Sequence, residues 1–155
     1  MAASSRFRRA TQADAAEIRA LTRAAYAKWV PLIGREPKPM GADYEAAVVE
    51  HLVDLYERDG KLLGLVEMIP GPDHMLIENL AVHPSSQGQG VGDMLLAHAE
   101  QCAAAFGLKE TRLYTNAKFA ANLAFYAKRG YNEFRSETLA PGSVAVHMRK
   151  QMAGT

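Results

Sequence analysis

Three alternating glycines constrain this chain more than any other feature. They lie in the segment QGQGVG, residues 87–92, directly before an apolar helical pattern that extends to Gly107. Glycine has no Cβ atom, so it permits unusual backbone angles and lets a bound group come close. The first N–H groups of a helix have no intrahelical partner, and the helix dipole is positive there. The segment therefore predicts an anion site, with the N–H groups of residues 87–93 facing a phosphate.

Three phosphate-binding patterns can be compared with this segment. The nucleoside-triphosphate loop needs Gly-Lys-Ser or Gly-Lys-Thr at the helix start, whereas Asp93 and Met94 follow Gly92 here. The dinucleotide pattern G-x-G-x-x-G fails because the third glycine comes one position early, and because several expected strands precede it. A third pattern, Q/R-x-x-G-x-G/A, is matched at every fixed position. For the glycines alone, a flexible strand-to-helix turn without a ligand remains the alternative.

Hydrophobic periodicity predicts a mixed α/β (α+β) fold in the order β-α-α-β-β-β-α-β-α-β-β. A hairpin with an Asp59-Gly60 turn is expected over residues 52–70. The other expected strands cover residues 5–11, 74–82, 111–115, 131–137 and 144–150. The expected helices run from Thr11 or Asp14 to about Lys28, over 44–52, from the glycine segment to Gly107, and from an Asn116 cap to Gly130. Residues 31–43, with three prolines and two glycines, are expected to form a loop.

Composition excludes several classes of partner. The formal net charge is +1, so no basic excess exists to attract nucleic acid or anionic lipid. No run of about 18 apolar residues is present, so no membrane span is expected. The single cysteine, Cys102, favours a reducing compartment, and the first 14 residues lack the apolar run of a secretory signal. We therefore expect one domain over residues 1–155 and a cytoplasmic location.

Metal chemistry is not expected from the sequence. The five histidines show none of the common metal-ligand spacings. Cys102 falls at helical spacing with Leu95, Ala99 and Phe106. This position favours an inert thiol packed in the core.

The surroundings of the glycine segment resemble the signature of the GCN5-related N-acetyltransferase (GNAT) superfamily. In that family a strand ending in LAV-x-P precedes the glycine pattern, as LAVHP does at residues 80–84. A later helix in the family carries spaced Asn, Tyr, Lys and Gly-aromatic positions, which NLAFYAKRGY supplies at residues 122–131. The resemblance extends over residues 5–150 and is strongest over 76–134. It implies a GNAT-like sheet whose central strands splay apart.

The resemblance implies acetyl-CoA as cosubstrate. The glycine segment would hold the pyrophosphate, and the free edge of the preceding strand would pair with the pantetheine amides as a partial extra strand. Such pairing requires a gap beside that strand, which the family forms between the strands at 74–82 and 111–115. Asp93 would contribute its N–H, but its carboxylate would weaken phosphate binding if it pointed inward. The expected cosubstrate contacts are Leu80, Ala81, Val82, Gln87, Gly88, Gln89, Gly90, Val91, Gly92, Asp93 and Asn122.

Tyr126 is the leading catalytic candidate, because the family uses a tyrosine at this position. A thiolate with a thiol pKa of about 8.5 leaves more easily when a nearby hydroxyl gives it a proton. Asn122 lies one helical turn earlier and can face the same groove, where its amide could hold the pantetheine arm or a water. The alternative is that Phe119, Leu123 and Tyr126 only form the core stripe of their helix.

A general base is harder to assign. An alkylammonium of pKa about 10 must lose a proton before it can attack the thioester. Glu78 is expected on the same strand face as Leu76 and Leu80, near the thioester, where it could act through water. Glu67 is the second possibility, and the alternative for either glutamate is a polar group on a partly exposed strand with no catalytic role. A backbone N–H near Leu80 is expected to stabilise the oxyanion.

The acceptor is expected to be a primary amine of a small molecule or a peptide. The family commonly forms the acceptor side of its cleft from the segment that this chain has at residues 26–44. There Tyr26, Trp29 and Tyr44 could wall a pocket, and Arg35 or Lys38 could meet a carboxylate; a solvated loop is the alternative. A non-catalytic sensor of acyl-CoA is the competing function. The resemblance also makes a homodimer possible.

Overall fold

A seven-stranded sheet in the order β1-β2-β3-β4-β5-β7-β6 organises the chain. The computed structural model describes residues 4–152, so the ends of the expected domain, 1–3 and 153–155, lie outside it. All neighbouring strands are antiparallel except β4 and β5, which are parallel. The expected mixed α/β fold is therefore confirmed. The strands are β1 (Ser5–Arg9), β2 (Leu52–Arg58), β3 (Lys61–Pro70), β4 (Met75–Val82), β5 (Glu110–Asn116), β6 (Asn132–Ala140) and β7 (Ser143–Gln151).

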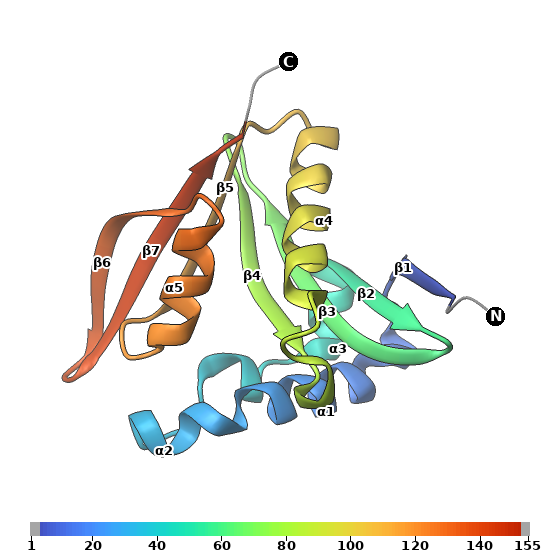
Figure 1. The fold of residues 1–155 in the computed structure, drawn as a ribbon, viewed down its shortest axis with the longest axis horizontal. Helices are drawn as coiled ribbons and strands as arrows, with labels where there is room; N and C mark the ends of the chain where they lie inside the picture. Colours follow the sequence, from blue (N-terminus) through green and yellow to red (C-terminus); the bar gives the residue numbers. More distant parts are fainter. Residues whose placement is uncertain (1–3, 153–155) are drawn as a thin grey trace.

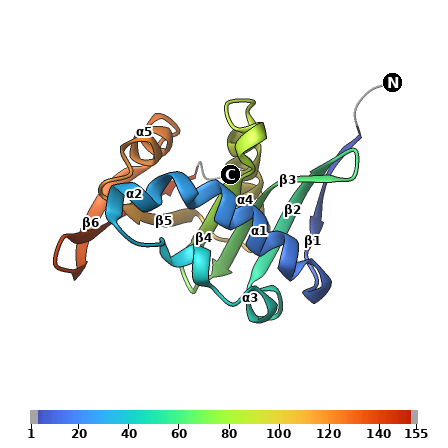
Figure 2. The same cartoon turned by 90° about the horizontal axis from the view of Figure 1, so that it is seen from below.

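Helices cover both faces of the sheet (Figure 1). The two helices α4 (Val91–Ala105) and α5 (Ala120–Lys128) lie on one side, and α1 (Ala15–Tyr26) and α3 (Tyr44–Glu50) pack on the other. Apolar residues of α4 recur every three or four positions, so one stripe of the helix is buried against β3 and β4. Figure 2 shows α1 and the short α2 (Val30–Ile33) running beneath the sheet toward α5 and β6.

Turn and cap residues explain several element ends. Asp59 and Gly60 have φ values of 52° and 79°, so the expected tight hairpin between β2 and β3 is confirmed. Gly107 and Gly130, with φ values of 76° and 96°, follow α4 and α5 and allow the left-handed turn that ends each helix.

Two expectations about local structure are wrong. The proline-rich segment 31–43 is not only a loop, because it contains part of α2 and a 3-10 turn over Lys38–Gly41. Proline is tolerated near a helix start, where its missing N–H has no intrahelical partner anyway. Asn116 does not cap α5: it ends β5, and its side chain accepts the Lys118 N–H at 2.9 Å, while Phe119 is the N-cap residue.

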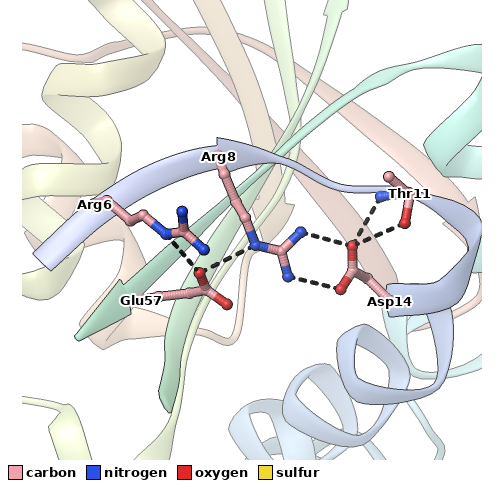
Figure 3. Close-up of polar contacts among 5 residues, drawn as sticks. All are labelled: Arg6, Arg8, Thr11, Asp14 and Glu57. Carbon is pink, nitrogen blue, oxygen red and sulfur yellow. Dashed lines mark hydrogen bonds and ion pairs between the residues drawn. The ribbon is translucent and has the colours of Figure 1, made fainter. Parts of the chain in front are cut away.

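An ion-pair network ties β1 to β2 and to the start of α1 (Figure 3). The guanidinium of Arg8 donates two hydrogen bonds to Asp14, at 2.8 and 2.9 Å, and a third to Glu57 at 3.1 Å. Asp14 also accepts the Thr11 N–H at 2.8 Å, as a residue at a helix start often does. The Arg8 guanidinium holds the pKa of Asp14 at about 2. This network stabilises the edge of the sheet farthest from β5 and β7.

Within residues 4–152, every helix is too short or too polar to cross a bilayer.

Candidate active site

The sheet opens between β4 and β5, as the resemblance implies. These strands pair at three positions only, from Met75 with Thr111 to Ile77 with Leu113. Beyond Ile77 they separate, so β4 continues to Val82 with one edge unpaired. Figure 1 shows the two strands close together at one end and diverging toward α1. A free strand edge presents N–H and C=O groups to any extended ligand.

The glycine segment forms the turn that begins α4. Gly88 and Gly90 have φ values of 79° and 84°, conformations that side chains strongly disfavour. The first backbone hydrogen bond of the helix runs from the Met94 N–H to the Gly90 carbonyl at 3.2 Å. The N–H groups just before Met94 therefore have no partner within the helix and remain available to an anion.

Gly92 lets α4 pack closely against α5, in addition to letting a ligand come close to the turn. A Cβ atom at this position would lie 3.1 Å from the Phe125 ring, so only glycine fits between α4 and α5 without displacement. The Arg129 guanidinium lies over the same ring, 3.7 Å from its centroid, and pairs with the Asp93 carboxylate. Arg129 lowers the pKa of Asp93. The Asp93 charge is thus neutralised by a cation at the mouth of the glycine turn.

A cleft of about 410 Å³ joins this turn to the open edge of β4. Most of the expected cosubstrate contacts line it: Leu80, Ala81, Val82, Gln87, Gly88, Gly90, Gly92, Asp93 and Asn122. Two expected contacts do not. Val91 is buried in the core, and the Gln89 side chain donates to the Ser85 carbonyl at 3.3 Å, so these residues can offer only their N–H groups.

Two cations at the cleft were not anticipated from the sequence. Lys28 lines the cleft, and its Nζ donates to Gln87 Oε1 at 3.3 Å. Arg129 lines it from α5. Both belong to segments that the glycine motif does not include, so only the folded chain brings them to the anion site. A phosphate in the turn would meet the Lys28 ammonium, whereas the Arg129 charge is shared with Asp93.

Tyr126 lies in the cleft wall and in the core at once. Its ring packs edge-on against Phe125 and Tyr131, with centroids 5.2 and 5.8 Å apart. Its hydroxyl makes no hydrogen bond among residues 4–152, and Tyr126 lines the cleft together with Asn122. Burial raises the pKa of Tyr126 to about 12, so the hydroxyl keeps its proton at neutral pH. Tyr126 can therefore pack in the core with its ring and still offer its hydroxyl proton to a ligand in the cleft.

Glu78 occupies a β-bulge at the point where β4 and β5 separate. Pairing with β3 moves from Ile77 directly to Asn79, so Glu78 is the extra residue. Leu80 then packs with the same core cluster as Ile77. The expectation that Glu78 shares a face with Leu76 and Leu80 is wrong, because the bulge reverses the alternation of side chains.

The bulge directs Glu78 into a second, smaller cavity of about 110 Å³. Glu78 Oε1 accepts the Tyr114 hydroxyl at 2.7 Å and lies 3.7 Å from Lys38 Nζ. Tyr26 lines both this cavity and the larger cleft, so the two meet at its side chain. Trp29 and Phe119 stack at 4.4 Å, Trp29 lining the cleft and Phe119 the small cavity.

Glu67, the second candidate base, lies on β3 and faces the side of the sheet that α3 covers. It is buried on β3, and its Oε2 is 2.6 Å from His51 Nδ1. Burial raises the pKa of Glu67, and the neighbouring His51 opposes that shift. Glu67 borders a hollow beside α3, which Glu78 and Lys38 also line, but it lines neither the cleft nor the small cavity. The structure therefore brings Glu78, and not Glu67, to the open edge.

A buried polar network fixes Tyr26 at the junction of the two cavities. The Tyr26 hydroxyl donates to Asn79 Oδ1 at 3.0 Å, and Asn79 Nδ2 donates to the Tyr44 hydroxyl at 3.2 Å. The Tyr44 hydroxyl donates to the Pro39 carbonyl at 2.6 Å. Tyr44 is thus a buried support, and it lines the hollow beside α3 that Glu78 and Lys38 also line, instead of the small cavity. The only sequence signal for Asn79 is an amide within an apolar strand.

One further group of polar side chains lies outside both cavities. His98 Nε2 is 2.7 Å from Asp54 Oδ2 and 3.6 Å from Cys102 Sγ. The spacing of the histidines did not indicate this group. Arg9 Nε donates to the other oxygen of Asp54 at 2.5 Å, so the carboxylate is already paired. Burial and Asp54 raise the pKa of the half-buried Cys102, which agrees with an unreactive thiol.

A splayed mixed sheet, with a glycine turn at the head of a helix and a cleft along the free strand, defines a GNAT-like fold. A family model described as "Acetyltransferase (GNAT) family" matches residues 17–131. The chain therefore belongs to the GNAT family of acetyltransferases.

Solved structures show the same fold. PaiA N-acetyltransferase from Thermoplasma acidophilum, in complex with coenzyme A, is 20% identical, with a TM-score of 0.81 over 96% of this chain and 99% of that one. The ribosomal-protein-S18-alanine N-acetyltransferase of Escherichia coli is 19% identical, with a TM-score of 0.78 over 98% and 96%. A GCN5-related N-acetyltransferase structure from Rhodopseudomonas palustris is 26% identical, with a TM-score of 0.75 over 98% and 99%. No curated protein sequence matches this chain.

Proposed function

We propose that this protein transfers the acetyl group of acetyl-CoA to a primary amine by direct attack on the thioester. The observation that carries the proposal is the continuous cleft, which joins the glycine turn, the free edge of β4 and the Tyr126 hydroxyl. The turn suits the pyrophosphate, the strand edge suits the pantetheine amides, and the hydroxyl suits the departing sulfur. The coenzyme A in the Thermoplasma structure supports the same ligand class.

The residues divide the proton transfers between them. The amine nitrogen forms a bond to the acetyl carbon, and the carbon–sulfur bond breaks. Glu78, directly or through water, takes the proton that the attacking ammonium must lose, because it faces the cavity next to the cleft. Tyr126 gives its proton to the departing thiolate. It regains a proton from the second one that the nitrogen loses, when the tetrahedral intermediate collapses to the amide. A free N–H near Leu80 stabilises the oxyanion of the tetrahedral intermediate.

Thermal-shift measurements test the cosubstrate. A ligand that prefers the folded state raises the midpoint of unfolding. Acetyl-CoA and coenzyme A should raise it, whereas NAD and ATP should not. If neither coenzyme A species raises it, the proposal fails. A panel of primary amines, followed by release of the coenzyme A thiol, then tests catalysis. Stabilisation by acetyl-CoA without thiol release for any amine would favour the acyl-CoA sensor instead.

The proposal also includes the extent of the domain, the location of the protein and its assembly. We infer one N-acetyltransferase domain over residues 1–155, a cytoplasmic location and possible assembly into a homodimer. The location rests on the single, unpaired Cys102. Sedimentation equilibrium tests the homodimer, since a mass near 16.9 kDa at all concentrations would contradict it.

A further inference from the structure

The small cavity beside Glu78 carries an excess of positive charge. Among the described residues that line it, Glu78 is the one acid, whereas Arg35 and Lys38 are two bases. The larger cleft belongs to the cosubstrate, so this cavity is the place for the acceptor. An acceptor amine that is protonated in water brings a further positive charge with it. The cavity therefore favours an acceptor that also carries a negative charge.

Arg35 is fixed in position and has N–H donors free to bind a negatively charged group. Its Nη2 donates to the Ser143 hydroxyl at 2.5 Å, and Ser143 is buried at the start of β7. This contact joins the segment after α2 to the far side of the cavity. Within residues 4–152, Arg35 makes no ion pair with a carboxylate, and a guanidinium has five N–H donors. Fixed donors that remain free suit a planar carboxylate.

Lys38 and Glu78 supply the other half of the recognition. Lys38 Nζ is 3.7 Å from Glu78 Oε1, so a cation and an anion stand side by side at the cavity wall. A substrate ammonium can approach Glu78 while a nearby substrate carboxylate meets Lys38 or Arg35. A second amino group on the acceptor would instead face two cations and be repelled.

The rest of the cavity is small and mainly apolar, with hydroxyl and amide groups from Tyr26, Tyr114, Thr115, Asn116 and Ser143. Ile33, Phe119, Leu139 and Val144 are among its lining residues, and its volume is about 110 Å³. A long polar chain would lose its hydration against these side chains without gaining partners. A compact, partly apolar molecule has few polar groups whose hydration would be lost there.

We propose that the acceptor is an aminocarboxylate, meaning a small molecule with a primary amine, a carboxylate and an apolar remainder. This inference rests on the proposed acetyl transfer and narrows its acceptor. Glu78 receives the amine, and Arg35 with Lys38 receives the carboxylate. Polycationic amines are the class that the cavity disfavours most.

Two matched series of amines test the acceptor class. The first compares L-leucine with 3-methylbutylamine, and the second compares 6-aminohexanoate with hexylamine and 1,6-diaminohexane. Both use saturating acetyl-CoA and thiol release as the readout. In at least one series, we expect kcat/KM for the aminocarboxylate to be at least about tenfold higher than for the amine that lacks the carboxylate. The reason is that hydrogen bonds between charged groups are strong. The diamine should be the poorest acceptor of the second series.

Variants then connect the preference to the two cations. Arg35→Gln and Lys38→Gln should each lower the ratio of kcat/KM for the carboxylate to kcat/KM for the plain amine. Lys61→Gln removes an exposed lysine at the β2–β3 turn and should leave that ratio as it is. If one cation variant folds poorly, the ratio in the other still decides the matter.

The outcomes separate this inference from the acetyl transfer on which it rests. Equal or higher kcat/KM for the plain amine in both series, or a diamine that is the best acceptor of all the amines compared, overturns the aminocarboxylate and leaves acetyl transfer intact. Stabilisation by acetyl-CoA with no amine acetylated overturns the aminocarboxylate class as well. The absence of any stabilisation by acetyl-CoA overturns the proposed function itself.

Discussion

The two cavities at the open edge are built in different ways. The cleft of about 410 Å³ has backbone along one side, namely a free strand edge and a glycine turn that permits close approach, and side chains of α1 and α5 along the other. The cavity of about 110 Å³ is formed by side chains from α1, the segment after it, β4, β5 and the β6–β7 turn. Backbone features serve any protein that binds the same cosubstrate, whereas this set of side chains is particular to the chain. The difference separates what the protein shares with its family from what selects its acceptor.

Tyr126→Phe should have the largest effect, because the proposed mechanism gives Tyr126 the protonation of the leaving thiolate. We expect kcat to fall about 100-fold or more, with little change in the affinity for acetyl-CoA. Tyr131→Phe is the matched control, because that hydroxyl is bonded to Thr111 and Glu100 instead of facing the cleft. Steady-state kinetics and calorimetric titration of acetyl-CoA measure both. Unchanged turnover would remove Tyr126 from the mechanism.

The pH dependence follows from the same residue. Burial raises the pKa of Tyr126 to about 12, so its hydroxyl stays protonated up to about pH 11. Tyr126 should therefore contribute no loss of activity between pH 7 and 10. If wild-type kcat falls in that range and the fall disappears in Tyr126→Phe, Tyr126 loses its proton below pH 10, and the raised pKa is wrong.

Glu78→Gln should affect the small cavity and spare the cleft. We expect kcat/KM for the amine to fall about tenfold to 100-fold, because the variant keeps the shape but cannot accept a proton. The dissociation constant of acetyl-CoA should stay within about twofold. Glu67→Gln offers a comparison, because Glu67 lines neither cavity. If the acidic limb of the pH–rate profile is the same in Glu78→Gln and wild type, Glu78 is not the base.

Lys28→Gln should do the reverse of Glu78→Gln: it should weaken the binding of acetyl-CoA and spare the small cavity. Lys28 is an exposed cation at the glycine turn, so its loss should weaken acetyl-CoA binding about threefold to tenfold. The loss should diminish as salt is added, because exposed charges are screened. Titrations at two salt concentrations check this, with Lys61→Gln as control. An equal affinity for wild type and variant at low salt would contradict the role of Lys28.

Asp14→Asn should change stability and leave both cavities alone. Arg8 holds the pKa of Asp14 at about 2, below its usual 3.8, so the ion pair stabilises the fold above about pH 4 and is lost as pH falls toward 2. After allowance for solvent screening, we expect the variant to lose about 1 kcal/mol at pH 7. The difference from wild type should vanish near pH 2. Denaturant unfolding at both pH values measures it, and a constant difference would refute the linkage.

The sequence predicted the cleft better than the small cavity, for a physical reason. Gly88 and Gly90 encode a backbone conformation directly, and the strand, turn and helix that create the cleft are consecutive in the chain. Arg35 and Ser143 are 108 residues apart, and nothing local shows that they meet. The bulge at Glu78 was equally hidden, because nothing in the segment MLIENLAV marks one residue as unpaired. Lys28 belongs to the 3-10 turn that follows α1, and its contact with Gln87 joins two segments 59 residues apart. Figure 2 shows α1 running beneath the sheet.

Amide hydrogen exchange with and without acetyl-CoA tests the arrangement of the cleft most directly. Saturating acetyl-CoA should slow exchange in residues 80–82 and 88–93, since their N–H groups would bond to the pantetheine arm and the pyrophosphate. Residues 5–9 and 52–58, at the far edge of the sheet, should exchange at the same rate in both conditions. Bound acetyl-CoA that leaves residues 80–93 unprotected, or protects only another segment, would contradict the proposed site.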